Sequence, residues 1–226
     1  NQMLTIVFAT GNPNKLKEIK SAVKSFEIVG LKDLGINEEI PETGDTLKKN
    51  ALQKAKCVYD KTGLNCFSDD TGLEIEALNY RPSVYSAMYA GSDCNAENNM
   101  RKVLSELKTF QNRKAKFKTV IALILNGKEY FFEGEVKGEI LKEKKGSDGF
   151  GYDPIFKPNG YDETFAQMSI ELKNKISHRG LAVKKILILL KQQELNHQKT
   201  KKLPNKKKIV SSAFNSSFLF KKKKKN

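Results

Sequence analysis

Short apolar runs separated by polar turns and amphipathic stretches dominate the first 190 residues. Leu4–Ala9 is rich in β-branched and aromatic residues and predicts a buried strand. A turn follows, and Asn12 before Pro13 predicts the start of a helix. The apolar stripe of that helix is Leu16, Ile19, Val23 and Phe26. A strand, a glycine turn and a helix in this order are typical of the opening of an α/β domain.

The same alternation continues along the chain. Strands are predicted at Glu27–Leu31, Leu64–Ser68, Leu73–Ala77, Lys116–Leu125 and Lys128–Val136. Helices are predicted to begin after Thr46, Asn95 and Ser177, the last ending near Leu190. Asn126-Gly127 separates the last two strands and predicts a tight hairpin. Residues 146–151 form a glycine-rich loop.

The charge of the chain divides it into two parts. The 226 residues carry a formal charge of +15, and residues 191–226 hold 12 Lys and one Glu, which gives +11. Residues 1–190 therefore carry 15 − 11 = +4 and predict one nearly balanced domain. Residues 191–226 are expected to be a disordered basic tail of low complexity. A nucleic acid partner is expected only through this tail.

Other classes of protein are excluded by simple counts. No apolar run approaches the roughly 20 residues that span a bilayer, so no membrane association is expected. Residues 1–8 lack a basic region followed by an apolar region, so no signal peptide is expected. Cys57, Cys66 and Cys94 are odd in number and form no C-x-x-C pair, which favours reduced thiols and a cytoplasmic location.

The first polar cluster that could bind a ligand is the segment T-G-N-P-N-K at residues 10–15. Backbone N–H groups at a helix N-terminus attract anions, and the nearby lysine adds a positive charge. The spacing matches neither a P-loop nor a dinucleotide fingerprint. An ordinary strand–helix turn and a phosphate cradle are therefore equally good interpretations of this segment alone.

Adjacent carboxylates form the second cluster, in S-D-D-T-G at residues 68–72. Asp69 and Asp70 repel each other unless a cation such as Mg²⁺ compensates, and one of them could deprotonate a water molecule. Glu42 could add another oxygen ligand. The alternative is a simple turn, in which Asp and Gly are common.

Two further clusters lie late in the chain. G-F-G-Y-D-P at residues 149–154 combines glycines, which allow close approach to a ligand, with aromatic faces that could stack on a base. K-N-K-I-S-H-R at residues 173–179 places His178 and Arg179 in the first turn of a helix, where cations oppose the helix dipole. A ligand explains that placement better than folding does. The alternatives are a tight turn with two core aromatics and a structural histidine.

The four motifs together describe a nucleotide enzyme, and their order resembles the inosine triphosphate pyrophosphatase family over about residues 4–190. The resemblance implies an elongated α/β fold with a long, curved mixed sheet, surrounding helices and two lobes that frame a central cleft. It also implies a homodimer. The implied activity is Mg²⁺-dependent hydrolysis of ITP, dITP or XTP to the monophosphate and pyrophosphate.

The resemblance also implies roles for individual residues. Substrate binding is implied for Thr10, Gly11, Asn12, Asn14, Lys15, Lys54, Thr71, Phe150, Gly151, Tyr152, Asp153, Lys173, His178 and Arg179. The lysines are expected at the phosphates, and the residues from Phe150 to Asp153 with His178 and Arg179 at the base. Glu42 and Asp70 are implied metal ligands, with Asp70 as the base and Asp69 as an acidic helper. One departure is Met88, where family members often have Arg.

Two other functions are compatible with these residues. The first is a related nucleotide pyrophosphatase that prefers pyrimidine or modified nucleotides. The second is a basic nucleic-acid-binding protein led by its tail. A substrate panel separates the first from the purine enzyme, and removal of residues 191–226 separates the second.

Overall fold

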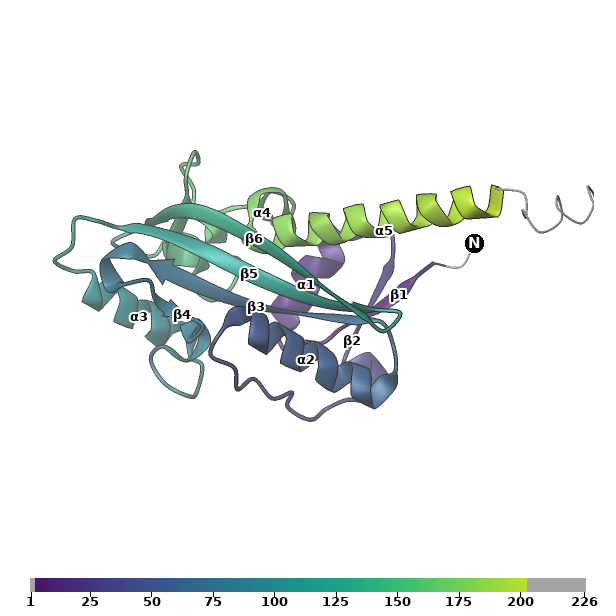
Figure 1. Cartoon of the computed structure of the whole chain (residues 1–226). Helices are drawn as coiled ribbons and strands as arrows, with labels where there is room; N and C mark the ends of the chain where they lie inside the picture. The colour runs from purple at the N-terminus through teal and green to yellow at the C-terminus, as the bar shows by residue number, and fades with distance from the viewer. Residues whose placement is uncertain (1–2, 203–226) are drawn as a thin grey trace, which may run out of the picture. The chain divides into compact units, whose positions relative to one another are not determined.

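A computed structural model describes residues 3–202 of the chain (Figure 1). The strands in this part are β1 (Thr5–Phe8), β2 (Glu27–Gly30), β3 (Cys66–Ile75), β4 (Arg81–Ser83), β5 (Lys114–Leu125), β6 (Lys128–Ile140) and β7 (Phe156–Pro158). The α-helices are α1 (Pro13–Ala22), α2 (Leu47–Thr62), α3 (Ala96–Glu106), α4 (Ile170–Ile176) and α5 (His178–Lys202).

The strands form one mixed sheet, in the order β2-β1-β3-β5-β6-β7, with β4 paired to the end of β3. β1 runs parallel to both β2 and β3, and the other neighbours are antiparallel. Parallel neighbours need a crossover connection, and α1 supplies the one between β1 and β2. The mixed α/β class expected from the sequence is confirmed.

The acidic motif lies within a strand rather than at the end of one. The prediction of two short strands separated by a turn at residues 69–72 is wrong, because β3 runs unbroken from Cys66 to Ile75 and pairs with β5 along its whole length. Gly72 serves close packing instead of a turn. A Cβ atom there would lie 2.6 Å from the carbonyl oxygen of Ser83, so glycine lets β4 approach β3.

The long hairpin is confirmed, with strands a few residues longer than expected. β5 and β6 pair in register from Leu125 and Lys128 at the turn to Lys114 and Glu139 at the far end. Both turn residues have positive φ, 51° for Asn126 and 78° for Gly127. That backbone conformation is why Asn-Gly is favoured in two-residue hairpins.

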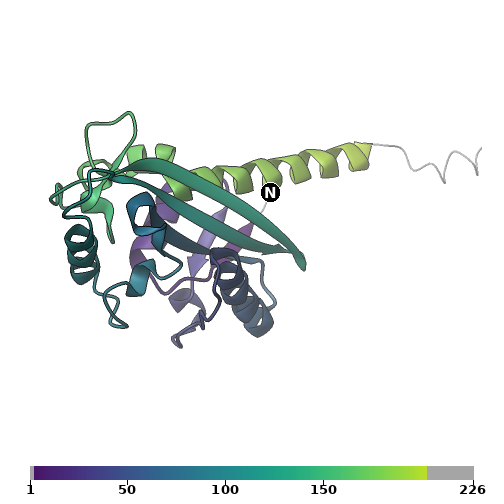
Figure 2. The ribbon, with the colours of Figure 1, turned by 60° about the vertical axis from the view of Figure 1, so that its left-hand side comes forward.

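Helices cover both faces of the sheet. α2 packs on β3 and β5, and Figures 1 and 2 show it on one side of these long strands, with the start of α5 on the other. The predicted caps are confirmed, because the side chains of Asn12, Thr46 and Asn95 accept backbone N–H groups of α1, α2 and α3. Ser177 Oγ likewise accepts the Gly180 N–H at the start of α5.

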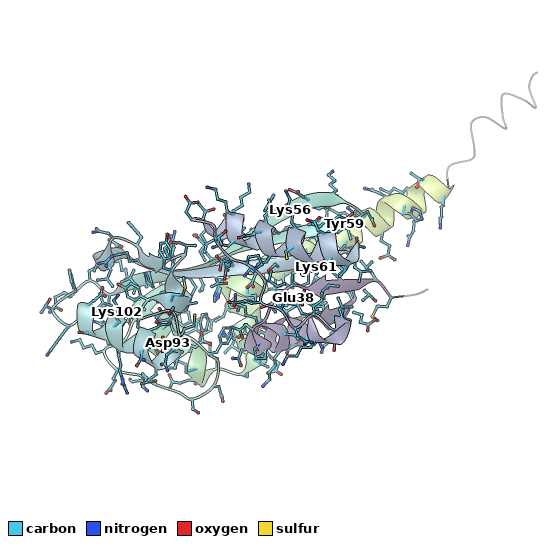
Figure 3. All side chains as sticks on the ribbon, turned by 90° about the horizontal axis from the view of Figure 1, so that it is seen from below. Glu38, Lys56, Tyr59, Lys61, Asp93 and Lys102 are labelled. Atoms are coloured by element: carbon cyan, nitrogen blue, oxygen red, sulfur yellow. The ribbon has the colours of Figure 1, made fainter. Side chains whose placement is uncertain are left out.

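The segment before α2 is held against that helix at several points. Near the end of α2, Lys61 pairs with Glu38, and the two residues lie next to each other in Figure 3. At the start of α2, Gln53 holds Thr43 through two hydrogen bonds, from Thr43 N to Gln53 Oε1 (2.8 Å) and from Gln53 Nε2 to Thr43 Oγ1 (3.0 Å). This segment carries Glu42 toward the sheet.

The last helix is longer than expected. The predicted end near Leu190 is wrong, because α5 continues to Lys202. Residues 191–202 contain no Gly or Pro and are rich in Lys and Gln, which favour helix. The compact unit ends at residue 186, and 187 onward is a separate unit. The disorder predicted for the rest of the tail, 203–226, concerns residues outside the described part.

Candidate active site

The turn after β1 positions the first polar cluster at the N-terminus of α1. Asn12 Oδ1 accepts the backbone N–H groups of Asn14 (2.9 Å) and Lys15 (3.3 Å), and Thr10 Oγ1 accepts the N–H of Asn12 (3.1 Å). The turn is therefore preformed. A Cβ atom on Gly11 would meet nothing within 4 Å, so the space around the turn is open.

Asp69 joins this turn to the start of α5. Its Oδ1 pairs with Lys15 Nζ at 3.2 Å, and its Oδ2 accepts Arg179 Nε at 2.8 Å. Burial of the Asp69 carboxyl opposes ionisation, but Lys15 and Arg179 outweigh it and hold the pKa of Asp69 well below its usual value. Asp69 is therefore a fixed anion between two cations.

Asp70 has different surroundings, because successive side chains of a strand point to opposite faces of the sheet. Its Oδ2 accepts Asn50 Nδ2 of α2 at 3.1 Å, and its Oδ1 accepts the N–H of Thr71 at 3.0 Å. Burial, together with the nearby Glu42 carboxylate, raises the pKa of Asp70 to about 7, although Lys54 opposes the shift. A carboxyl with this pKa can exchange a proton near neutrality.

Glu42 and Lys54 complete the α2 side. Lys54 Nζ pairs with Glu42 Oε1 at 3.0 Å and donates to the carbonyl oxygen of Asp69 at 2.6 Å. Burial disfavours ionisation of Glu42, but the Lys54 ammonium outweighs it and the pKa of Glu42 lies below its ordinary value. Glu42 and Asp70 are close enough for each carboxyl to shift the pKa of the other.

These two carboxylates fit a divalent ion that binds together with a phosphate. Within residues 3–202 no group of three His, Cys, Asp or Glu side chains is arranged to hold a metal ion. Mg²⁺ is commonly bound through one or two carboxylates, with water and substrate phosphates as the other ligands. Glu42 and Asp70 would hold such an ion.

A buried cluster of charges forms the other end of the site. Lys173 Nζ contacts Glu18 Oε1, and it pairs with Asp153 Oδ2 at 2.6 Å. Arg179 Nη1 donates to Glu18 Oε2 at 2.8 Å. Both cations lie over the Phe150 ring, with Lys173 Nζ 4.7 Å from its centroid. The structure thus groups Lys173 with the residues predicted for the base rather than with the phosphate lysines.

His178 is the other buried group at this end. Its ring stacks on Phe117 with centroids 4.7 Å apart. Burial, reinforced by Arg179 and Lys173, lowers the pKa of His178 well below 6.5, so the imidazole is neutral. Its Nδ1 has no hydrogen-bond partner within the described part of the chain. A buried polar atom without a partner is costly, and a ligand would satisfy it.

One predicted residue lies apart from this arrangement. Tyr152 is buried in the core, where its hydroxyl donates to the carbonyl oxygen of Ser86 at 2.6 Å, whereas the Phe150 ring lies under the two cations of the cluster. Gly151 has a φ of +60°, which fits the turn between these two aromatic residues. Met88, where the family often has Arg, is 49% exposed.

Three buried polar residues of the site were missed by sequence reasoning. Glu18 contacts Lys173 and Arg179, Asn50 contacts Asp70, and Thr119 Oγ1 donates to the carbonyl oxygen of Asp70 at 3.1 Å. None belongs to a recognisable motif. Glu18 stands beside the apolar stripe of α1, and its partners lie about 155 residues away in the sequence. The only available signal is a charged residue next to an apolar helix face.

One continuous set of contacts thus links a helix N-terminus, a pair of carboxylates and two buried cations over an aromatic ring, an arrangement typical of α/β proteins that process nucleotides. The model of the Ham1 family matches residues 6–188, and the chain belongs to this family. The resemblance found in the sequence is thereby confirmed.

Curated relatives and solved structures agree with this assignment. The chain is 54% identical over 183 residues to a dITP/XTP pyrophosphatase of Porphyromonas gingivalis, covering 80% of this chain and 94% of the relative. It is 52% identical over 188 residues to a dITP/XTP pyrophosphatase of Flavobacterium johnsoniae, covering 83% of this chain and 98% of the relative. The Ham1 protein of Staphylococcus aureus has a similar structure, with a TM-score of 0.75 and 36% identity over 84% of this chain and 99% of that one.

Proposed function

We propose that this protein hydrolyses aberrant purine nucleoside triphosphates, namely ITP, dITP and XTP, to the monophosphate and pyrophosphate with Mg²⁺. The observation that carries the proposal is the pair of contacts made by the Asp69 carboxylate. This one group contacts both Lys15, at the expected phosphate end, and Arg179, at the expected base end. The names of the relatives support the substrate class.

The chemistry follows from the surroundings of the two aspartates. Asp70 takes a proton from the attacking water molecule. The water oxygen bonds to the α-phosphorus, the bond from that phosphorus to the bridging oxygen breaks, and pyrophosphate leaves. Lys15 and Lys54 neutralise phosphate charge. Glu42 and Asp70 would hold Mg²⁺, which would neutralise further charge on the phosphate oxygens.

Base recognition is assigned to the opposite end. Hypoxanthine and xanthine carry a 6-oxo acceptor, which donors of Arg179 or the neutral His178 can satisfy, whereas the 6-amino group of adenine leaves these donors unpaired. Asp153 can accept the base N1–H. Guanine shares both groups, so its rejection requires exclusion of the 2-amino group by close packing around Phe150.

The test is pyrophosphate release from a panel of ITP, dITP, XTP, GTP, ATP, CTP and dUTP, with and without Mg²⁺. We expect release from the first three only, and none without the metal. Preference for a pyrimidine nucleotide would replace this proposal with the related pyrophosphatase, and GTP hydrolysis equal to that of ITP would refute the packing argument.

Assembly and location are part of the same proposal. We expect a homodimer, as the family resemblance implies, and light scattering coupled to size-exclusion chromatography would measure it. All three cysteines are free, which supports a reducing compartment such as the cytoplasm. No helix within residues 3–202 combines the length and the apolar character needed to cross a bilayer.

A further inference from the structure

Asn50 lies buried in the first turn of α2, between the segment that carries Glu42 and the strand that carries Asp70. Its exposed fraction is 3%. Its Nδ2 donates to Asp70 Oδ2 at 3.1 Å, and its Oδ1 accepts the backbone N–H of Gly44 at 2.6 Å. A single planar amide therefore connects the backbone beside one acidic residue to the side chain of the other.

The contact at Gly44 depends on close approach. A Cβ atom at residue 44 would lie 2.7 Å from Asn50 Oδ1 and 2.8 Å from Lys49 Cβ. Both distances are shorter than an unstrained Cβ contact, so glycine lets the backbone sit directly against the first turn of α2, and a methyl group there would displace the Asn50 amide. The neighbouring Thr43 is held separately by Gln53, through contacts that are exposed and do not touch an acidic residue.

The chemistry of the amide suits this position. The Asp70 carboxylate needs a hydrogen-bond donor, and the backbone N–H of Gly44 needs an acceptor. The side-chain amide of Asn50 supplies both. Aspartate at position 50 would lack the donor and add a third negative charge beside Glu42 and Asp70. Leucine would keep the approximate shape and lose both hydrogen bonds.

We propose that Asn50 is a positioning residue that fixes the separation of Glu42 and Asp70, so that the two carboxylates are arranged for Mg²⁺ before the nucleotide binds. This inference rests on the function proposed above and adds a residue to it. Partners that orient metal ligands typically change metal affinity by about 10–100-fold when they are removed. The effect should therefore appear in metal binding and less in nucleotide affinity.

The test compares Asn50→Leu with Gln53→Leu, which removes the neighbouring exposed anchor of the same segment. Mn²⁺ binding is measured by electron paramagnetic resonance in the presence of the non-hydrolysable α,β-methylene analogue of ITP. We expect the Mn²⁺ dissociation constant to rise about tenfold or more in Asn50→Leu, with the Mg²⁺ concentration for half-maximal turnover rising in parallel. KM for ITP at saturating Mg²⁺ should change less than about threefold, and Gln53→Leu should match the wild type.

A second variant guards against misfolding of the first. Gly44→Ala places a methyl group against Asn50 Oδ1 and disturbs the same contact from the other side, so the same rise in the Mn²⁺ dissociation constant is expected. Unchanged Mn²⁺ binding in either folded variant, or an equal loss in Gln53→Leu, overturns the role of Asn50. A wild-type enzyme inactive on the purine panel would instead refute the proposed function, and the two failures are therefore distinguishable.

Discussion

At the scale of single residues, the two adjacent aspartates have opposite acid–base properties. Asp69 is paired with two cations and stays ionised, whereas Asp70 is buried beside another carboxylate. The sequence shows that the two aspartates are adjacent, but it does not show which of them is paired with cations. That difference arises because β3 turns them toward different helices.

Asp70→Asn is expected to separate activity from stability. Turnover should fall by about 10²–10⁴-fold because the proposed general base is lost. A folded-state pKa raised from 3.8 to about 7 means that Asp70 contributes stability at low pH, which is lost as the pH rises through 7. Without metal, the variant should therefore gain about 2–4 kcal/mol over the wild type at pH 8 and little at pH 4.

Urea unfolding of both proteins at pH 4, 6 and 8 in EDTA measures this difference. The lowered pKa of His178 acts in the opposite direction, because its contribution is lost as the pH falls, but it is common to both proteins and cancels. A stability difference that does not vary with pH would contradict the assignment of the raised pKa to Asp70.

Glu18→Gln tests the charge cluster at the base end. Loss of this carboxylate leaves the buried cations Lys173 and Arg179 with one anionic partner fewer. The value of kcat/KM for ITP should therefore fall by about tenfold or more, and the preference of the enzyme for ITP over ATP should become smaller. The matched control is Glu27→Gln, which removes an exposed carboxylate bonded to Thr5. Equal kinetics in the two variants would show that Glu18 does not position the cations.

Sequence reasoning found the residues that belong to motifs and missed those that support them. Lys15, Asp69 and Arg179 stand in polar clusters whose composition is unusual, and the structure brings all three together. Glu18 and Asn50 are ordinary residues of amphipathic helices, and their roles depend on partners far away in the chain. Local pattern carries no information about such partners, so only the assembled fold identifies these residues.

At the scale of elements, the signals with a local physical cause were reliable. Helix caps and the Asn-Gly hairpin depend on neighbouring residues and were placed correctly. β3 was misread because Asp-Asp-Thr-Gly is typical of a turn, yet pairing with β5 keeps it extended. The hydrogen bonds between β3 and β5 therefore outweigh the local preference of this segment for a turn.

The crossing of α5 over β6 provides a prediction at this scale. A Cβ atom on Gly134 would lie 2.0 Å from the carbonyl oxygen of His178 and 2.8 Å from the backbone nitrogen of Ala182. Gly134→Ala should therefore shift the start of α5, cost about 1–3 kcal/mol of stability and weaken binding of the base.

Gly30→Ala is the matched control, since the one tight contact of its Cβ would be with the flexible end of the Leu16 side chain, at 2.9 Å, and Asp33 Oδ2 would lie at an ordinary 3.6 Å. Thermal unfolding and KM for ITP measure both variants. A destabilisation of Gly30→Ala equal to that of Gly134→Ala would show that the crossing is not tightly packed.

At the scale of the whole molecule, the proposed site and the basic segment are separate in sequence. Every residue assigned to the site lies between Thr10 and Arg179, and the family match ends at residue 188. Residues 191–226 carry +11 of the total charge of +15. The balanced part of the chain therefore contains the proposed chemistry.

Removal of residues 191–226 should leave kcat/KM for ITP within about twofold of the full chain, because no residue of the site is lost. A shorter deletion of 203–226 serves as the control for loss of the end of α5. Fluorescence anisotropy with a labelled RNA measures the alternative function in parallel. Loss of turnover together with loss of RNA binding would favour a nucleic-acid-binding protein.

The shared carboxylate of Asp69 has a consequence for small-molecule inhibitors. A phosphate that draws the Lys15 ammonium toward itself removes one of the two cations that contact the Asp69 carboxylate, which should tighten the pair with Arg179 and hold its guanidinium at the proposed base end. Pyrophosphate mimics and purine fragments should therefore reinforce each other when both are present. Joining the two halves in one compound gains more affinity than either half contributes separately.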